Sequence, residues 1–378
     1  MPSRPGVFIL WRTAIHADAD TMNGRFPSLT LPVLPPLAPM EAKSVETLPT
    51  GTGWQFEPKW DGFRCLAFRE GRTVVLQSKQ GEPLTRYFPE VVMAVANLPH
   101  ERFVLDGELV IVGAEGRLSY DVLQERLHPS ARKVAQLSAR SPATYLVFDL
   151  LAEDEESLLG KTLVERRKRL EAFFEDVEEG AGVHLSPVTA KRTEALGWLK
   201  NLESAGLDGL VAKKTGAKYQ SGQRDGMVKL KPQRTADCVV GGLRRGGEGG
   251  REVSALLLGL YDDEGRLHHV GAATGFPASV RKGLDKLLAP LLGGPSPFDG
   301  TAPGAETRFS HGKSRDWEPL RPELVAEVSY DRFDVDRFRN LTTFLRWRQD
   351  KAPARCTFDQ VRPPEAPKGA PGLELIGL

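Results

Sequence analysis

Apolar positions in the first part of the chain follow two periods, one typical of strands and one typical of helices. Short β-branched, aromatic and other apolar runs predict strands at 54–56, 63–68, 73–77, 103–112 and 145–151. Apolar residues three and four positions apart predict helices over 89–98, 163–177 and 191–204. Two further runs, 207–213 and 227–231, enclose a polar loop and predict a pair of strands. This irregular alternation favours an α+β domain with an antiparallel core over a doubly wound sheet.

The pattern changes near residue 232. Beyond it, Gly- and Pro-rich turns separate short strand candidates at 238–243, 255–261, 267–273 and 324–330, and one helix is predicted over 277–292. Several short strands with a single helix are typical of a small β-barrel of the oligonucleotide-binding (OB) type. We therefore predict two domains, with their boundary between residues 231 and 236.

The two ends of the chain carry no sustained period. Residues 1–23 follow neither pattern, and five prolines interrupt the stretch 24–39. We predict a disordered or extended N-terminal tail over 1–31, a Pro-rich segment lying extended over the first domain, and a flexible C-terminal tail over 366–378. The apolar stretch near the start is too short for a signal peptide.

Composition narrows the class of protein. The chain has 378 residues, 40% of them hydrophobic and 27% charged, which is ordinary for a globular protein. Its net charge is only +1, so any attraction to nucleic acid must come from local basic patches. No apolar run approaches the roughly 20 residues that span a bilayer. The cysteines Cys65, Cys238 and Cys356 are too scattered for a zinc site or a disulfide framework, which fits a cytoplasmic protein.

A lysine among charged residues stands between the first two predicted strands. Residues 57–64 read Glu-Pro-Lys-Trp-Asp-Gly-Phe-Arg, and this places Lys59 in a loop at the edge of a cleft. A lysine attacks phosphorus only when unprotonated, and its ordinary pKa is about 10.4. Burial or a neighbouring cation would lower that pKa and free the amine. Taken alone, the stretch also fits a surface lysine in a turn.

Carboxylates follow on the next predicted strands. Glu108, Asp149 and Asp208 each interrupt or end an apolar run. Lys229 and Lys231 lie two positions apart on one predicted strand and therefore on one face. Each group, considered singly, fits a bulge, a strand end or a hairpin. One amine, several carboxylates and a basic strand together are what metal-assisted nucleotidyl transfer requires.

The order of these segments resembles that of the ATP-dependent DNA ligases of the covalent nucleotidyltransferase superfamily, and most of all the small two-domain bacterial repair ligases. The stretch 57–64 is similar to the family's first motif, whose lysine carries AMP. Stretches similar to the later motifs follow in order at 78–81, 106–108, 145–149, 208–213, 229–231 and 344–351. The similarity extends from about residue 32 to about residue 361.

This resemblance implies an architecture and a reaction. It implies an antiparallel-sheet nucleotidyltransferase (adenylation) domain over 32–233, followed by an OB-fold β-barrel over 234–365. ATP would be the co-substrate, Mg²⁺ the metal with Mn²⁺ as an alternative, and nicked duplex DNA the partner of a monomeric enzyme. The enzyme would seal nicks between a 5′-phosphate and a 3′-hydroxyl through lysyl-AMP and adenylylated DNA. It would act in DNA repair, in the bacterial cytoplasm at the nucleoid.

The resemblance also implies roles for single residues. Lys59 would attack the α-phosphorus of ATP. Glu57 and Lys213 would contact adenine, and Phe148 would stack on its ring. Arg64 and Glu108 would hold the ribose. Phosphate would be bound by Lys79, Lys229 and Lys231, and the leaving pyrophosphate by Arg348 and Lys351. Asp208, together with Glu108, would ligate the metal.

Two positions depart from the family pattern. Asp208 stands where much of the superfamily has glutamate, and Lys79 stands where arginine is usual, so Lys79 offers a point charge and no bidentate fork. The alternatives are an RNA ligase or another nucleotidyltransferase of the superfamily and, from a different class, a non-catalytic oligonucleotide-binding protein. A nicotinamide-dependent ligase is disfavoured, because that class carries a four-cysteine zinc module. The sequence leaves open the repair pathway, the repair-protein partners and whether Met1 or Met22 is the true start.

Overall fold

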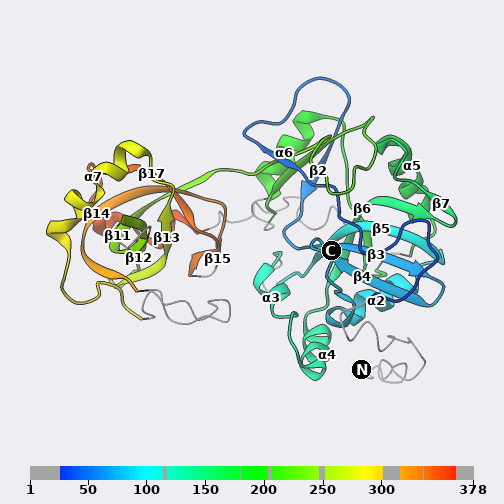
Figure 1. Ribbon diagram of the computed structural model, residues 1–378, viewed down its shortest axis with the longest axis horizontal. Helices are drawn as coiled ribbons and strands as arrows, with labels where there is room; N and C mark the ends of the chain where they lie inside the picture. Colours follow the sequence, from blue (N-terminus) through cyan, green and yellow to red (C-terminus); the bar gives the residue numbers. More distant parts are fainter. Residues whose placement is uncertain are drawn as a thin grey trace, which may run out of the picture. The chain divides into compact units, whose positions relative to one another are not determined.

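The computed structural model describes residues 26–113, 117–178, 180–202, 207–246, 252–300, 316–334 and 336–362, with the backbone alone for 200–202. The chain divides into two compact units between Lys231 and Pro232 (Figure 1). This division lies two residues before the predicted domain limit at 233/234. The predicted tails, 1–31 and 366–378, lie outside the described residues except for 26–31. No helix among the described residues is long and apolar enough to cross a membrane.

Two sheets build the first unit. Its strands are β1 (Lys43–Val45), β2 (Trp54–Lys59), β3 (Phe63–Glu70), β4 (Thr73–Ser78), β5 (Arg102–Val110), β6 (Thr144–Glu153), β7 (Glu156–Ser157), β8 (Val183–Leu185), β9 (Gly209–Lys214) and β10 (Met227–Leu230). One sheet has the order β1-β10-β9-β2, and the other β4-β3-β5-β6-β7 with β8 beside β6. Among the described strands of this unit, the pairs β1–β10 and β6–β8 are parallel and the other pairs are antiparallel. The sheets therefore agree with the predicted antiparallel core.

The described α-helices of this unit are α2 (Pro89–Ala96), α3 (Tyr120–Gln124), α4 (Ala131–Arg140), α5 (Leu163–Phe174) and α6 (Arg192–Leu202). Helices α2 and α5 pack on the six-stranded sheet, and α6 packs on the four-stranded sheet. Helix α5 begins at a capping box of Thr162 and Glu165. Val95 of α2 and Phe173 of α5 share one core cluster with Leu105 of β5. Helices α3 and α4 were not predicted, because their segment is largely polar.

The extended segment before β1 is part of the core. Leu29, Leu31 and Val33 are buried, in one cluster with Leu66 and Phe68 of β3. This burial agrees with the prediction of a Pro-rich segment lying extended over the first domain. Leu29 and Leu31 fall within the predicted tail 1–31, so the limit predicted for the tail is too far along the chain.

Two local predictions need correction. Lys59 is the last residue of β2 and not a loop residue, because the pairing of β2 with β9 continues as far as Lys59 opposite Gly209. Residues 106–108 lie within one continuous strand, β5, and do not interrupt it. The pairing of β5 with β3 is regular through them, and the irregularity is a register shift against β6 between Asp106 and Gly107.

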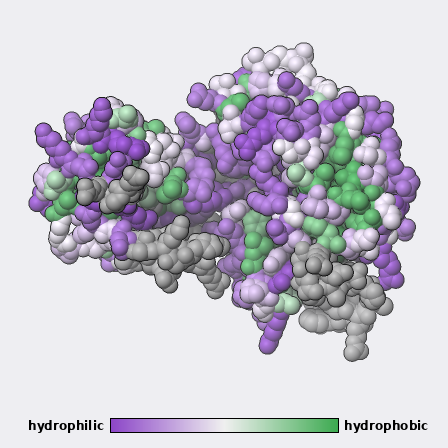
Figure 2. All heavy atoms as spheres, in the orientation of Figure 1, coloured by the Kyte–Doolittle hydropathy of each residue, from purple (hydrophilic) through white to green (hydrophobic). Residues whose placement is uncertain are grey.

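A closed barrel builds the second unit. Its elements are β11 (Arg234–Gly246), β12 (Glu252–Tyr261), β13 (Leu267–Thr274), α7 (Ala278–Leu288), β14 (Glu318–Tyr330), β15 (Phe333–Asp334), β16 (Arg337–Phe338) and β17 (Thr342–Trp347). The barrel order is β11-β12-β13-β17-β14, with α7 between β13 and β14 in the chain. Strand β17, which was not predicted, closes the barrel by pairing with both β13 and β14. Hydrophilic residues cover most of the face drawn in Figure 2.

Candidate active site

A pocket in the first unit gathers most of the predicted site residues. Its volume is about 210 Å³, and one wall is the end of β2. The predicted residues that line it are Glu57, Lys59, Arg64, Lys79, Glu108, Phe148, Lys213 and Lys229. Asp208 joins this group through its contact with Lys59, and Lys231 joins it through its contact with Asp208. The fold therefore brings together residues that lie up to about 170 positions apart in the sequence.

Three Asp-Gly pairs stand where backbones approach most closely. A Cβ atom at Gly62 would lie 2.0 Å from the carbonyl oxygen of Leu109, and one at Gly107 would lie 2.5 Å from that of Leu146. At Gly209 it would lie 2.1 Å from the carbonyl oxygen of Leu230, and the φ angle of +137° also favours glycine. No residue with a side chain fits at these three positions without moving the backbone. The glycines thus set the strand packing that places the neighbouring carboxylates.

Lys59 is held by the carboxylate of Asp208, the residue just before β9. Its Nζ atom lies 2.5 Å from Oδ2 of Asp208, and the same oxygen lies 2.9 Å from Nζ of Lys231. Burial lowers the pKa of Lys59, but the charges of Asp208 and Glu108 outweigh burial, so the pKa of Lys59 is raised. The expectation of a lowered pKa is therefore wrong for the ligand-free protein, because the neighbouring groups are anions.

Burial also shifts the pKa values of two other titratable groups of the pocket. Burial raises the pKa of Glu108 to about 7, against the opposing charges of Lys59 and Arg64. Burial, and then the charges of Lys59 and Lys231, lower the pKa of Lys229. The pocket is thus lined by four lysines and three glutamates within a small volume, and its ammonium groups can bind a polyphosphate.

Glu57 and Phe148 form the other end of the pocket. Oε2 of Glu57 lies 2.7 Å from Nζ of Lys213, and its Oε1 accepts a hydrogen bond of 2.8 Å from Nε2 of Gln55. The Lys213 ammonium and the Arg64 guanidinium lie 4.4 and 4.5 Å from the centre of the Phe148 ring. A carboxylate, an ammonium and an aromatic ring together can bind a heterocyclic base.

Arg64 belongs to a buried network that the sequence did not reveal. Its Nε and Nη2 atoms each donate to Asp106, at 2.6 Å. Asp106 also accepts a bond of 2.7 Å from the Tyr219 hydroxyl, and that hydroxyl accepts the backbone N–H of Met40 at 3.1 Å. Residues 39–42 line the pocket, so Tyr219 connects one wall of the pocket to the strand that carries Glu108.

Lys79 lies at the rim of the pocket. Its ammonium is 3.2 Å from Oε2 of Glu41, which is also 3.0 Å from Nη2 of Arg224. Nearly half of the Lys79 side chain is exposed, so Lys79 is available to a bound phosphate. Glu41 was not predicted, because it lies between the Pro-rich stretch and the first motif, in neither of them.

Asp149, the remaining carboxylate that was predicted near the site, forms a buried ion pair in the core. Arg166 of α5 donates to both of its oxygens, at 2.8 and 2.9 Å, and both side chains are buried. Asp149 does not line the pocket that contains Lys59. The ion pair joins α5 to β6, next to Phe148.

The carboxylates of the pocket suit a metal ion that is held mainly by a bound nucleotide. Among the described residues, no cluster of three or more His, Cys, Asp or Glu side chains could hold a metal ion. Asp208 and Glu108 offer hard oxygen atoms, and Mg²⁺ commonly takes one or two carboxylates together with phosphate oxygens and water. These residues therefore fit Mg²⁺ that arrives with a nucleotide better than a permanent all-protein site.

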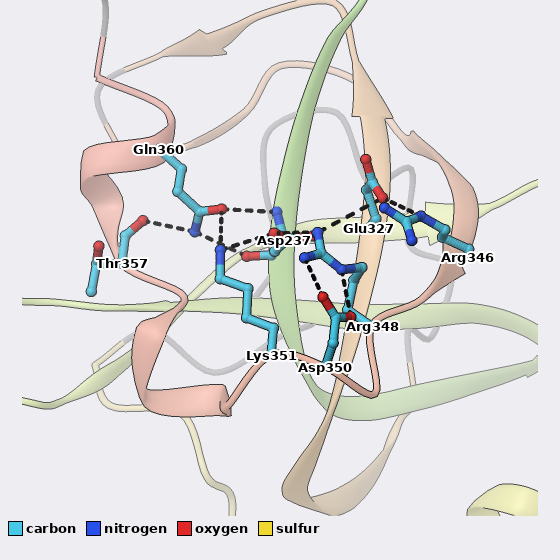
Figure 3. A network of polar contacts seen from close by, with 8 residues as sticks. All are labelled: Asp237, Glu327, Arg346, Arg348, Asp350, Lys351, Thr357 and Gln360. Carbon is cyan, nitrogen blue, oxygen red and sulfur yellow. Dashed lines mark hydrogen bonds and ion pairs between the residues drawn. The ribbon is translucent and has the colours of Figure 1, made fainter.

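Arg348 and Lys351 lie in the second unit, around Asp237 of β11 (Figure 3). Nη1 of Arg348 donates to both oxygens of Asp237 at 2.9 Å, and Nζ of Lys351 donates to Oδ2 at 2.8 Å. The Gln360 amide bonds both backbone polar groups of Asp237, at 3.1 Å each. Arg348 also donates to both oxygens of Asp350. Asp237 is thus a fixed anchor for both predicted pyrophosphate ligands.

Comparisons with known proteins agree with this arrangement. Family models match over residues 35–231, described as "ATP dependent DNA ligase domain", and over residues 249–351, described as "ATP dependent DNA ligase C terminal region". DNA ligase C2 of Mycolicibacterium smegmatis is 42% identical, over 89% of this chain and 97% of that protein. The multifunctional non-homologous end joining protein LigD of Pseudomonas aeruginosa is 32% identical, over 88% of this chain and 38% of that protein.

A solved structure supports the fold alone. The structure described as "Pmar-Lig_Pre." matches with a TM-score of 0.57 at 16% identity, over 83% of this chain and 68% of that one. The family models together cover more than half of the chain, and the mycobacterial relative is similar along nearly its whole length. The chain therefore belongs to the family of ATP-dependent DNA ligases, enzymes that seal nicks in DNA through a lysyl-AMP intermediate.

Proposed function

We propose that Lys59 carries AMP in this ligase and that the pocket beside it binds ATP. One observation carries the proposal. Alternation along β2 puts Glu57 and Lys59 on the same face, so one strand presents a base-binding carboxylate and a nucleophile to a single pocket. The base would lie at Glu57, Lys213 and Phe148, and the phosphates would lie at Lys59, Lys229 and Lys231.

The first step would transfer AMP to the protein. Nζ of Lys59 attacks the α-phosphorus, a P–N bond forms, the bond to the β-phosphate breaks, and pyrophosphate leaves. Lys59 must first lose its proton and its contact with Asp208, which lies 2.5 Å away. Lys229 and Lys231 would neutralise the charge that develops on the α-phosphate. Arg64, fixed by Asp106, and Glu108 would hold the ribose.

Asp208 and Glu108 would hold Mg²⁺ together with the phosphates. The ion would neutralise phosphate charge. The carboxylate of Asp208 would then pair with the metal in place of Lys59, so that metal binding and release of the nucleophile are linked. Mn²⁺ prefers similar oxygen ligands and is an alternative.

The later steps would use DNA. AMP passes from Lys59 to the 5′-phosphate of a nick, and the 3′-hydroxyl then displaces AMP to form the phosphodiester bond. We propose that residues 32–233 form the adenylation domain and that residues 234–365 form a barrel of the OB type. The barrel order and the position of α7 support the second assignment. Arg348 and Lys351 would orient the pyrophosphate in the first step.

A role in DNA repair is part of the proposal. It is supported by the similarity to the end joining protein of Pseudomonas aeruginosa, of which this chain matches a part. The bacterial source of the relatives supports a place at the bacterial nucleoid, in the cytoplasm, and we propose that the enzyme acts as a monomer on nicked duplex DNA.

Labelled ATP provides the test. The wild-type protein, incubated with ATP labelled at the α-phosphate, should retain covalent label that is stable to alkali and labile to acid, as a phosphoramidate is, and should lose it when pyrophosphate is added. Nicked substrates with DNA or RNA strands should then be compared, and sealing of the all-DNA nick should be fastest. A protein that binds oligonucleotides without retaining label would contradict the proposal, and faster sealing of RNA would favour an RNA ligase.

A further inference from the structure

Gln55 stands in line with two residues of the pocket but does not reach it. It lies on β2 two residues before Glu57, so Gln55, Glu57 and Lys59 share one face of the strand. Glu57 and Lys59 line the pocket, whereas Gln55 is buried behind them. The side chain of Gln55 is therefore placed to act on a ligand only through Glu57.

Gln55 and Lys213 hold the two oxygens of Glu57 from one side. The Gln55 amide donates to Oε1 at 2.8 Å, and the Lys213 ammonium lies 2.7 Å from Oε2. Gln55 and Lys213 lie directly opposite each other on β2 and β9, so the two donors are neighbours. Glu57 is only 2% exposed. Each carboxylate oxygen has two lone pairs, so both oxygens can still accept a bond from a ligand.

We infer that Gln55 is a specificity-determining residue that acts by positioning: it fixes Glu57 as an acceptor for the 6-amino group of adenine and so excludes 6-oxopurine nucleotides. The inference rests on the proposed contact between Glu57 and the base. A fixed carboxylate can accept from an amino group but cannot donate. A 6-oxo group would bring a second acceptor against it and leave buried polar groups unpaired, the arrangement that gives the largest discrimination between substrates.

Lys213 alone does not give this rigidity. It holds one oxygen of Glu57, and its ammonium also lies over the Phe148 ring, 4.4 Å from the centre. With one oxygen held, the carboxylate can turn about its last side-chain bond, and the second oxygen can move away from a 6-oxo group. The Gln55 amide prevents that rotation and, being neutral, leaves the negative charge of Glu57 paired with a single cation.

The test uses the full-length protein with ATP and with inosine triphosphate, which carries a 6-oxo group. Gln55→Met keeps the length of the side chain and removes the amide. The rate of nucleotidyl-enzyme formation, measured over a range of each nucleotide, gives kcat/KM for ATP and for inosine triphosphate. We expect Gln55→Met to narrow the ratio of these two values by about ten- to a hundredfold, mainly through KM.

Two further variants make the result decisive. Gln77→Met is the matched control: Gln77 is a buried glutamine of β4 whose amide bonds the backbone of Leu37, away from the pocket. It should lower the melting temperature and leave the ratio unchanged. Glu57→Gln tests the proposed base contact itself, because an amide can turn and donate to a 6-oxo group; it should shift the preference toward inosine triphosphate.

The outcomes are distinguishable. An unchanged ratio in Glu57→Gln would contradict the base contact and the inference built on it. A changed ratio in Glu57→Gln with an unchanged ratio in Gln55→Met would overturn the role of Gln55 alone. An equal fall in kcat/KM for both nucleotides in Gln55→Met would also overturn the role of Gln55, because it would show that the amide only supports the fold.

Discussion

Lys59 and Asp208 are joined twice, once through the backbone and once through their side chains. The backbone N–H of Asp208 donates to the carbonyl oxygen of Lys59 at 3.0 Å, and the Lys59 ammonium lies 2.5 Å from Oδ2 of Asp208. The first contact fixes where β2 ends, and the second fixes where its last side chain lies. The nucleophile is therefore held, protonated, by the carboxylate that is also proposed to bind the metal.

Substitution of Lys59 should separate charge from nucleophilicity. Lys59→Ala should lower the yield of labelled protein by more than about a thousandfold, because the attacking amine is gone. Lys59→Arg can keep the ion pair with Asp208, but a guanidinium stays protonated and should fail equally. Retention of label from α-labelled ATP is the measurement. Label on either variant, at unchanged melting temperature, would place the nucleophile elsewhere.

Changes at Asp208 should depend on charge more than on length. Asp208→Asn removes the anion that Lys59 and Lys231 share, and we expect a loss of about a hundredfold in lysyl-AMP formation. Asp208→Glu keeps the anion and should retain activity within about tenfold of wild type. Both variants should be measured across a Mg²⁺ titration. If Asp208→Asn and the wild type form lysyl-AMP at the same rate at every Mg²⁺ concentration, Asp208 is not a metal ligand.

The glycine beside Asp208 should resist even the smallest substitution. In Gly209→Ala the new Cβ atom would lie 2.1 Å from the carbonyl oxygen of Leu230, at a φ angle of +137°. We expect a cost of about 2–3 kcal/mol to the free energy of unfolding of the first unit. Gly216→Ala is the matched control on the loop after β9, because nothing lies within 4 Å of its Cβ position. Urea unfolding should show a lowered midpoint for the first variant only.

The site residues could be named from the sequence because the motifs that carry them are short and follow in a fixed order. Alternation along β2 groups Glu57 with Lys59, but the predicted strand ended at residue 56, so neither residue was predicted to lie on a strand face. Gln55 obeys the same alternation, so its place behind Glu57 could have been inferred from position alone. Its hydrogen bond to Glu57 was missed because the resemblance to the family drew attention only to residues that meet the ligand.

Other features depend on residues distant in the sequence and left no local signal. The pKa of Lys59 is raised by Asp208, which lies 149 positions later, so its direction follows from the fold and not from the first motif. Residues 39–42 line the pocket because the Tyr219 hydroxyl accepts the backbone N–H of Met40 and so holds this segment in place. Strand β17 was missed because exposed Leu345 and Arg346 interrupt the apolar alternation within it.

The barrel should lose stability in mild acid through His269 of β13. Burial and then the charge of Arg244 lower the pKa of His269 to about 4. The unfolded chain binds the proton at a pKa of about 6.5, so stability is complete above that pH and falls as pH decreases toward 4. His269→Gln cannot bind this proton, so its free energy of unfolding should decrease less between pH 7 and pH 5. Urea midpoints at pH 7, 6 and 5 provide the measurement, and an equally steep fall in the variant would contradict it.

Removal of both Asp237 partners should affect the first step and spare the last. Arg348→Ala with Lys351→Ala removes the two cations that are proposed to orient pyrophosphate, and we expect lysyl-AMP formation to fall by about a hundredfold. Sealing of a nick whose 5′-phosphate already carries AMP involves no pyrophosphate and should stay within a few-fold of wild type. Lysyl-AMP formation is followed on protein gels with α-labelled ATP, and sealing is followed on DNA gels with a labelled, pre-adenylylated strand.

Stability must be separated from chemistry in this variant, because Asp237 is buried and would keep its charge without either cation. Adding Asp237→Asn removes that charge at nearly constant volume and should restore the melting temperature of the barrel. If the triple variant is stable yet still forms little lysyl-AMP, the loss belongs to Arg348 and Lys351 and not to a weakened fold. Arg348 and Lys351 only stabilise the barrel around Asp237 if the triple variant recovers both its stability and lysyl-AMP formation. The same conclusion follows if the double variant loses both reactions equally.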